Sequence, residues 1–237
     1  MNGQKEAEVM IQVEQVRRTY KMGEVEVKAL QGVDLNIEKG EFISIAGPSG
    51  SGKTTLLNII GSIDDMDGGK VTIEGRDIGE MNKLQRAEFR RENLGFIFQS
   101  YNLIPVLTAF ENVSFALSLL KLPKDEIKKS TMAILKEVGL EGMEHRLPTR
   151  LSGGQQQRVA IARALVKKPA IILADEPTAN LDSHTGEEIL KLMQKMNEKH
   201  QTTFIFSTHD KMVMKYARRL VLLHDGMVTE DKVKQEV

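Results

Sequence analysis

The sequence predicts an α/β fold with a mostly parallel sheet, an N-terminal antiparallel β subdomain and an inserted α-helical subdomain. Three observations lead to this prediction. Short β-type runs separated by turn residues fill residues 10–74, helical patterns dominate residues 84–142, and a strand–helix–strand order returns after residue 165. That order is typical of βαβ units, whose strands run parallel. The helical middle is therefore expected to be an insertion into an α/β core.

The first part of the chain carries the strand patterns. Val33, Leu35 and Ile37 alternate with polar residues, as they do in a strand with one buried face. The later run "FISIAG" is almost entirely apolar and leads directly into a glycine-rich segment. A central strand buried on both faces has this composition.

The middle and the last third follow in order. The segment "DEIKKSTMAILKEVGL" predicts a helix that ends at Gly139. Its apolar stripe comprises Ile127, Met132, Ile134, Leu135 and Val138. Beyond it, "AIILADEP", "TTFIFSTHD" and "RLVLLHDG" are expected strands, and a helix is expected over about residues 185–198.

Composition excludes several classes of function. Lysine and arginine (33) balance aspartate and glutamate (33), so no overall basic field favours nucleic acid, and no nucleic-acid partner is expected. The most basic stretches, at Arg90 and Lys121, interleave acids and are typical of solvated helix faces. The chain has no cysteine, which excludes disulfides and thiolate metal sites. No run approaches the roughly 18–20 apolar residues that span a bilayer, so the chain is not expected to cross a membrane itself.

The segment "GPSGSGKTT" carries the first chemical motif. Gly47, Gly52, Lys53 and Thr54 satisfy the phosphate-loop pattern G-x-x-x-x-G-K-[ST], and the segment lies between an expected strand and an expected helix. Backbone amides at a helix start bind phosphate oxygens, Lys53 adds a positive charge, and the Thr54 hydroxyl suits Mg²⁺. The loop alone leaves kinases, GTPases, helicases and transport ATPases open.

Two adjacent carboxylates end the apolar strand "AIILADEP". At the carboxyl end of a buried strand, Asp175 can hold Mg²⁺ through water, and Glu176 can lie where an attacking water would be. By themselves such acids are often a solvated turn. Together with a phosphate loop they predict a nucleotide site.

The segment "LSGGQ" is a second candidate anion site. Ser152 can cap the following helix, and Gly153 and Gly154 expose backbone amides. An isolated S-G-G would more simply be an ordinary capped helix. A single subunit does not need two such sites for one phosphate group.

Taken together, these motifs resemble those of the ATP-binding cassette (ABC) ATPases. The segments "GPSGSGKTT", "FIFQSYNL", "LSGGQQQR", "ILADEPTANLD" and "STHD" occur in the order and rough spacing of that family, over nearly the whole chain. The resemblance implies one ABC ATPase domain over residues 9–232, with a RecA-like P-loop NTPase core and a helical subdomain at about residues 99–164. The segment "SIDDMDGG" departs from the family, because it lacks the proline that many relatives place after the phosphate-loop helix.

The same resemblance implies roles for individual residues. The ATP-binding residues are Tyr20, Gly47, Pro48, Ser49, Gly50, Ser51, Gly52, Lys53, Thr54, Thr55, Gln99, Ser152, Gly153, Gly154, Gln155 and Asp182. The Mg²⁺-binding residues are Thr54, Gln99 and Asp175, and the catalytic residues are Glu176, His209 and Lys53. Tyr20 matches the aromatic residue that stacks on adenine, although it could also be an ordinary tyrosine at a strand end.

Members of the family pair head to tail, so the resemblance implies a homodimer with ATP at its interface. "LSGGQ" of one subunit then covers the γ-phosphate held by the other, and Asp182 lies in the loop that crosses the interface. This arrangement explains the second anion site.

The resemblance also implies integral-membrane permease subunits as partners, and a location on the cytoplasmic face of the cell membrane. Docking is expected beside Gln99, where Tyr101, Leu103, Ile104, Pro105 and Leu107 could equally be core. "YNLIP" and "ILADEPTANLD" are similar to cassettes of lipoprotein release, macrolide export and antimicrobial-peptide resistance, the lipoprotein-releasing systems above all. Two alternatives remain open: a regulator that acts on a permease-like partner in cell division, and a soluble ABC protein of DNA repair or translation.

Overall fold

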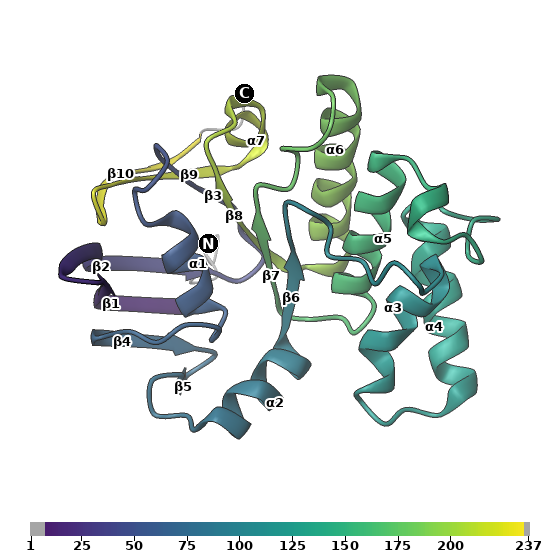
Figure 1. Cartoon of the computed structure of the whole chain (residues 1–237), viewed down its shortest axis with the longest axis horizontal. Coiled ribbons are helices and arrows are strands. Elements are labelled where there is room, and N and C mark those ends of the chain that lie inside the picture. The colour runs from purple at the N-terminus through teal and green to yellow at the C-terminus, as the bar shows by residue number, and fades with distance from the viewer. Residues whose placement is uncertain (1–7, 235–237) are drawn as a thin grey trace, which may run out of the picture.

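The computed structural model describes residues 8–234. Figure 1 shows two sheets and a group of helices on one side. The strands are β1 (Val9–Met22), β2 (Val25–Glu38), β3 (Phe42–Ala46), β4 (Gly68–Ile73), β5 (Arg76–Asp77), β6 (Leu94–Ile97), β7 (Ile171–Asp175), β8 (Thr203–Thr208), β9 (Arg219–His224) and β10 (Met227–Val233). The helices are α1 (Lys53–Ile60), α2 (Lys83–Asn93), α3 (Ala109–Ser118), α4 (Lys124–Glu137), α5 (Gly153–Leu165), α6 (Ser183–His200) and α7 (Lys211–Tyr216), with a 3-10 turn at Pro148–Arg150.

The two sheets differ in direction. One has the order β2-β1-β4-β5, and all of its pairs are antiparallel. The other has the order β10-β9-β3-β8-β7-β6, in which only the β9–β10 pair is antiparallel. This arrangement confirms the predicted α/β class with an N-terminal antiparallel β subdomain.

Strand β3 lies in the middle of the parallel sheet, between β8 and β9, and all five of its residues are buried. Phe42 faces one hydrophobic cluster, whereas Ile43 and Ile45 belong to the cluster on the opposite face. The prediction of a central strand buried on both faces is therefore confirmed. Its carboxyl end carries the phosphate loop.

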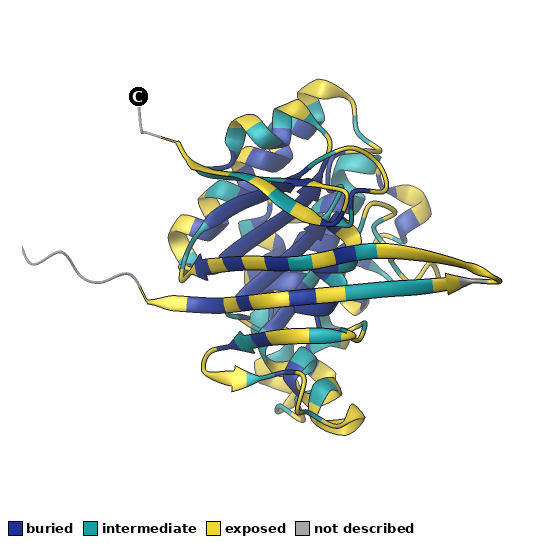
Figure 2. Ribbon diagram, turned by 90° about the vertical axis from the view of Figure 1, so that its left-hand side faces the viewer, coloured by how far each residue is buried: buried dark blue, intermediate teal, exposed yellow. Residues whose placement is uncertain are grey.

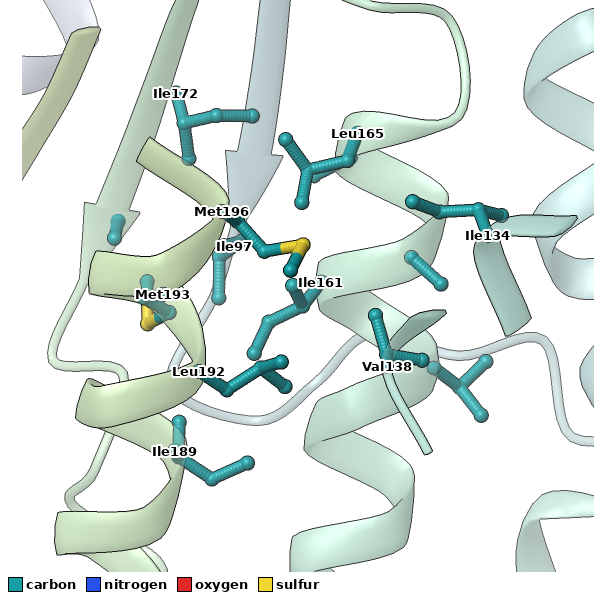
Figure 3. Close-up of a cluster of buried hydrophobic side chains, with 14 of the residues drawn as sticks. Ile97, Ile134, Val138, Ile161, Leu165, Ile172, Ile189, Leu192, Met193 and Met196 are labelled. Carbon is teal, nitrogen blue, oxygen red and sulfur yellow. The ribbon is translucent and has the colours of Figure 1, made fainter. Parts of the chain in front are cut away.

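The two clusters divide the interior into layers. On one face of the parallel sheet, α1 packs together with the inner side of the antiparallel sheet, whose alternation of buried and exposed residues is visible in Figure 2. On the other face, α3, α4, α5 and α6 share a continuous core with the sheet, and Figure 3 shows its centre between α5 and α6. Helices α3 to α5 are thereby packed onto the α/β core.

Three expectations need correction. Residues 84–142 are not entirely helical, because β6 forms an edge strand beside β7. Met132 was expected on the buried stripe of α4 but is 40% exposed, whereas Ile134 and Leu135 are buried. Helix α6 begins at Ser183 and ends at His200, so it is longer at both ends than the expected 185–198.

Candidate functional site

The site lies where three neighbouring parallel strands end. Strands β3, β8 and β7 are adjacent, and their registers pair Ala46 with Thr208 and Asp175 with Ser207. The phosphate loop, Glu176 and His209 follow directly after these strands. Because the carboxyl ends of parallel strands meet at one edge of a sheet, segments far apart in the sequence converge there.

A cavity of about 600 Å³ opens at this edge. Most of its lining residues were predicted from the sequence: Tyr20, Pro48, Ser49, Gly50, Gly52, Lys53, Thr54, Thr55, Gln99, Glu176 and His209. Val27 and Ala29 of β2 also line it and were missed. The antiparallel sheet thus supplies apolar surface beside Tyr20, while the parallel sheet supplies the polar end.

Close packing explains two of the glycines in the phosphate loop. A Cβ atom on Gly47 would lie 2.1 Å from the carbonyl oxygen of Leu223, and one on Gly52 would lie 2.3 Å from that of Ala29. Gly52 also has φ +101°, in the region that favours glycine. Helix α1 begins immediately afterwards, with no side-chain cap among the described residues. Its first amides therefore stay free for an anion.

Lys53 spans the phosphate loop. Its ammonium group donates hydrogen bonds of 2.8 Å to the carbonyl oxygens of Gly47 and Pro48. Burial lowers the pKa of Lys53, and the carboxylates of Glu176 and Asp175 offset part of that shift. A bound triphosphate would add negative charge and favour the charged lysine further.

Thr54 and Asp175 bring two oxygen donors together. The Thr54 hydroxyl lies 3.3 Å and 3.5 Å from the two Asp175 carboxylate oxygens. Gln99 adds an amide group to the same cavity. Mg²⁺ prefers hard oxygen ligands and is commonly held by one or two carboxylates plus substrate phosphates, so this donor set fits Mg²⁺.

Glu176 is held by residues at the end of β8. Its carboxylate accepts hydrogen bonds from the Thr208 hydroxyl (2.9 Å) and the His209 amide (3.2 Å). Nδ1 of His209 lies 2.6 Å from the same carboxylate. Glu176 itself has φ +46°, which is uncommon for a residue with a side chain and is found at functional sites. The backbone conformation and Thr208 were not predicted from the sequence.

The structure does not bring all predicted residues together. Gly47, Ser51 and Asp175 lie next to the cavity, in the phosphate loop and at the end of β7, without being part of its lining among the described residues. Ser152, Gly153, Gly154 and Gln155 form the start of α5, outside the cavity. Asp182 caps α6, where its carboxylate accepts hydrogen bonds from the backbone amide and the hydroxyl of Thr185.

Comparisons with known proteins agree with this fold. The ABC transporter family matches residues 30–179. The chain is 47% identical to an uncharacterized ABC transporter ATP-binding protein of Methanocaldococcus jannaschii, MJ0796, over 94% of this chain and 97% of that protein. A solved dimeric structure of MJ0796, in a post-hydrolysis state bound to ADP and Pi, matches with a TM-score of 0.87 and 45% identity over 96% of this chain and 100% of that chain.

Two further relatives carry names that describe export. The bacitracin export ATP-binding protein BceA of Halalkalibacterium halodurans is 40% identical over 92% of this chain and 87% of its own length. The macrolide export ATP-binding/permease protein MacB of Syntrophobacter fumaroxidans is 42% identical over 92% of this chain. The chain spans only 31% of that MacB protein.

The fold and the site define a P-loop ATPase. More narrowly, the chain belongs to the ABC transporter family, as its ATP-binding, ATP-hydrolysing component. Among residues 8–234, every helix is too short or too polar to cross a membrane.

Proposed function

We propose that this chain is an ATP-hydrolysing subunit that drives a separate integral-membrane permease, of the kind that releases lipoproteins or exports macrolides or peptides. The observation that carries the proposal is the cavity at the ends of β3, β7 and β8, where a phosphate loop faces Glu176 and His209. We take residues 9–232 as a single ABC ATPase domain, with residues 99–164 as its helical subdomain.

Some of the site residues bind the nucleotide, and others act in its hydrolysis. The phosphate loop, from Gly47 to Thr55, binds the triphosphate through its amides and Lys53, and Tyr20 stacks on the adenine. Thr54, Asp175 and Gln99 would hold Mg²⁺, which neutralises charge on the phosphate oxygens when it is bound. Hydrolysis then depends on positioning one water and stabilising the charge that develops.

Glu176 is the residue that we assign to the attacking water. Residue Glu176 lines the cavity, and its carboxylate is held by the Thr208 hydroxyl and the His209 backbone amide, so its orientation is set before the substrate arrives. A carboxylate held in this way can accept a proton from water that attacks the γ-phosphorus. His209, whose side chain is 70% exposed, is free to turn from Glu176 toward the γ-phosphate.

A homodimer would complete the site. Ser152 and the glycines after it start α5 outside the cavity of their own chain, so they can act on ATP only in another subunit. The dimeric structure of the similar MJ0796 supports this arrangement. Asp182, at the start of α6, would lie at the same interface.

The permease partner is inferred from the relatives and from one exposed segment. BceA and MacB are named for export, and the name of MacB includes a permease. After Gln99, the side chains of Ile104, Pro105 and Val106 are exposed, whereas Leu103 and Leu107 are partly buried. The exposed part of this segment is where we place permease docking, which would hold the chain at the cytoplasmic face of the membrane.

The test is Glu176→Gln, which keeps the shape of the side chain and removes its charge. We expect ATP binding to persist while turnover falls by about 100-fold or more, the usual contribution of a general base. The variant with ATP is expected to shift from monomer to dimer in light scattering. ATP turnover and molar mass are measured on the same preparation.

Glu126→Gln is the matched control, because Glu126 is exposed on α4. It should hydrolyse ATP at the rate of the unaltered chain. Normal turnover by Glu176→Gln would refute the assigned role. An ATP-bound variant that stays monomeric would refute the dimer.

A further inference from the structure

We propose that Asp64, Arg18 and Asp67 form a positioning cluster that fixes the ring of Tyr20 for the base of the bound nucleotide. The proposal rests on the proposed function, in which Tyr20 meets adenine. It adds the residues that hold Tyr20 in place and predicts that they govern affinity for the base, not for the phosphates.

The contacts of the cluster surround Tyr20. The Tyr20 hydroxyl donates a hydrogen bond to the carboxylate of Asp64. The guanidinium of Arg18 donates to Asp64 (2.7 Å) and to Asp67 (2.9 Å). The amide of Thr19 donates to the Asp67 carboxylate (2.6 Å), and the amide of Asp67 donates to the carbonyl oxygen of Arg17 (2.9 Å), so the strand on both sides of Arg18 is bonded to the same loop.

Arg18 also determines which face of the ring is free. Its guanidinium carbon lies 4.8 Å from the centroid of the Tyr20 ring, over one face. Tyr20 lines the cavity together with Val27 and Ala29, whereas Arg18 is not part of that lining. A planar ligand in the cavity therefore meets the face that Arg18 leaves open. A cation on the covered face is itself attracted to the ring, which keeps the stack in one orientation.

The cluster is attached to the helix that carries the phosphate loop. The amides of Ile63 and Asp64 donate hydrogen bonds to the carbonyl oxygen of Asn58 in α1, at 2.8 Å and 3.2 Å. Helix α1 begins at Lys53, at the phosphate end of the cavity. Asp64 thus fixes the ring of Tyr20 relative to the phosphate loop, and the distance from base to phosphate is set before a nucleotide binds.

A simple surface ion pair would not account for these features. Exposed pairs contribute little to stability, but the Arg18 and Asp64 side chains are only 20% and 22% exposed. Asp64 also accepts hydrogen bonds from two partners, the hydroxyl of Tyr20 and the Arg18 guanidinium that covers the Tyr20 ring. Asp64 and Asp67 come from "SIDDMDGG", the segment that departs from the family pattern.

The experiment is a double-mutant cycle with two ligands. Affinities for ATP and for inorganic tripolyphosphate, each with Mg²⁺, are measured by calorimetry on the full chain carrying Tyr20→Phe, Asp64→Ala or both. We expect each single variant to weaken ATP binding by about three- to tenfold, within the usual range for groups in contact. The double variant should be no weaker than either single one, and tripolyphosphate affinity should not change.

Two further variants sharpen the cycle. Asp64→Asn can still accept a hydrogen bond from Tyr20, so it should recover part of the lost ATP affinity. Asp65→Ala is the matched control, because the neighbouring Asp65 pairs with Arg86 and not with Tyr20. It should bind ATP normally.

Three results would overturn the proposal: normal ATP affinity in Asp64→Ala, additive effects in the double variant, or an equal loss for tripolyphosphate. The last would mean that Asp64 acts on the phosphate loop. Tyr20→Ala tests the underlying assumption separately. If the Tyr20→Ala variant binds ATP normally, Tyr20 does not contact the base. The function proposed for the rest of the site is then unaffected.

Discussion

Helices α1 and α5 both have glycines and a serine at their starts, yet their first turns are built differently. Helix α1 follows Gly52, which has φ +101°, and no side chain among the described residues caps it. Helix α5 follows Ser152, which accepts a hydrogen bond from the Gln155 amide, while the Gln155 side chain accepts one from the Ser152 amide. The start of α1 has no side-chain cap, whereas the start of α5 is partly satisfied by its own capping box.

The difference shows two ways to prepare a helix for an anion. The uncapped amides of α1 lie at the end of a cavity, where a phosphate can satisfy them. In α5 the cap satisfies the Gln155 amide without a ligand, and the amides of Gly153 and Gly154 stay available for one. A serine hydroxyl that accepts one hydrogen bond still has its own proton to donate. Ser152 can therefore cap α5 and still bind a phosphate oxygen of another subunit.

The largest expected difference comes from adding one methyl group at each helix start. Gly52→Ala would place Cβ against a backbone oxygen at 2.3 Å and in an unfavourable φ region, so we expect a loss of about 1–3 kcal/mol and little ATP binding. Gly153→Ala would meet the ends of two side chains, the Tyr101 hydroxyl at 3.0 Å and Leu181 Cδ2 at 3.4 Å, and its closest backbone atom would be the Asn180 oxygen at 3.8 Å. Alanine also favours helices. The variant should change stability by less than about 1 kcal/mol.

Urea unfolding of both variants, with the unaltered chain beside them, measures this difference. Equal stabilities for Gly52→Ala and Gly153→Ala would mean that the two helix starts tolerate a side chain equally well. The contrast in packing would then have no energetic meaning.

The second prediction separates the two roles of Ser152. Ser152→Ala removes the cap and should cost about 1 kcal/mol of stability. Ser152→Asp keeps a capping side chain, so stability should be retained, but its charge would repel a phosphate. We expect both variants to lose most ATP hydrolysis, and only the alanine variant to lose stability.

Unfolding free energy and ATP turnover are therefore measured on the same two proteins. If Ser152→Asp hydrolysed ATP normally, Ser152 would be a cap and nothing more. The proposed contact with ATP in another subunit would then be wrong.

Much of this contrast could be predicted from local sequence, because both helix starts are defined by consecutive residues. The phosphate loop and the capping serine lie within single segments, as do the paired acids at the end of β7. Strand β6 was missed because it has only four residues between helical patterns, and its pairing with β7 is a tertiary contact. Val27 and Ala29 were missed because no local pattern brings the antiparallel sheet to the phosphate loop.

The contacts of Tyr20 and Glu176 show the same limit. Tyr20 meets Asp64, 44 residues away, and Glu176 meets Thr208, 32 residues away. The motifs identify such functional residues by type. They do not identify the neighbours that orient them, because those neighbours are determined by how the sheets and helices pack.

The smallest expected effect is a difference between the two helix starts in how the unfolding free energy depends on pH. Burial lowers the pKa of Lys53 below its ordinary value of 10.5, although Glu176 and Asp175 offset part of the shift. Between its lowered pKa in the folded chain and 10.5, the unfolded chain binds more protons at Lys53, so stability rises with pH in that window. Below both values, the folded chain carries the full cost of the buried charge.

Replacing Lys53 by methionine removes this dependence, whereas Ser152 has no charge to titrate. The unfolding free energy of the unaltered chain, minus that of Lys53→Met, should therefore rise between neutral pH and 10.5. The same difference taken with Ser152→Ala should stay constant, because every other titrating group cancels. Urea unfolding at several pH values tests both. If both differences in unfolding free energy varied with pH in the same way, the Lys53 charge would be as well solvated in the folded chain as in water. The phosphate loop would then not hold a desolvated ammonium group before a ligand binds.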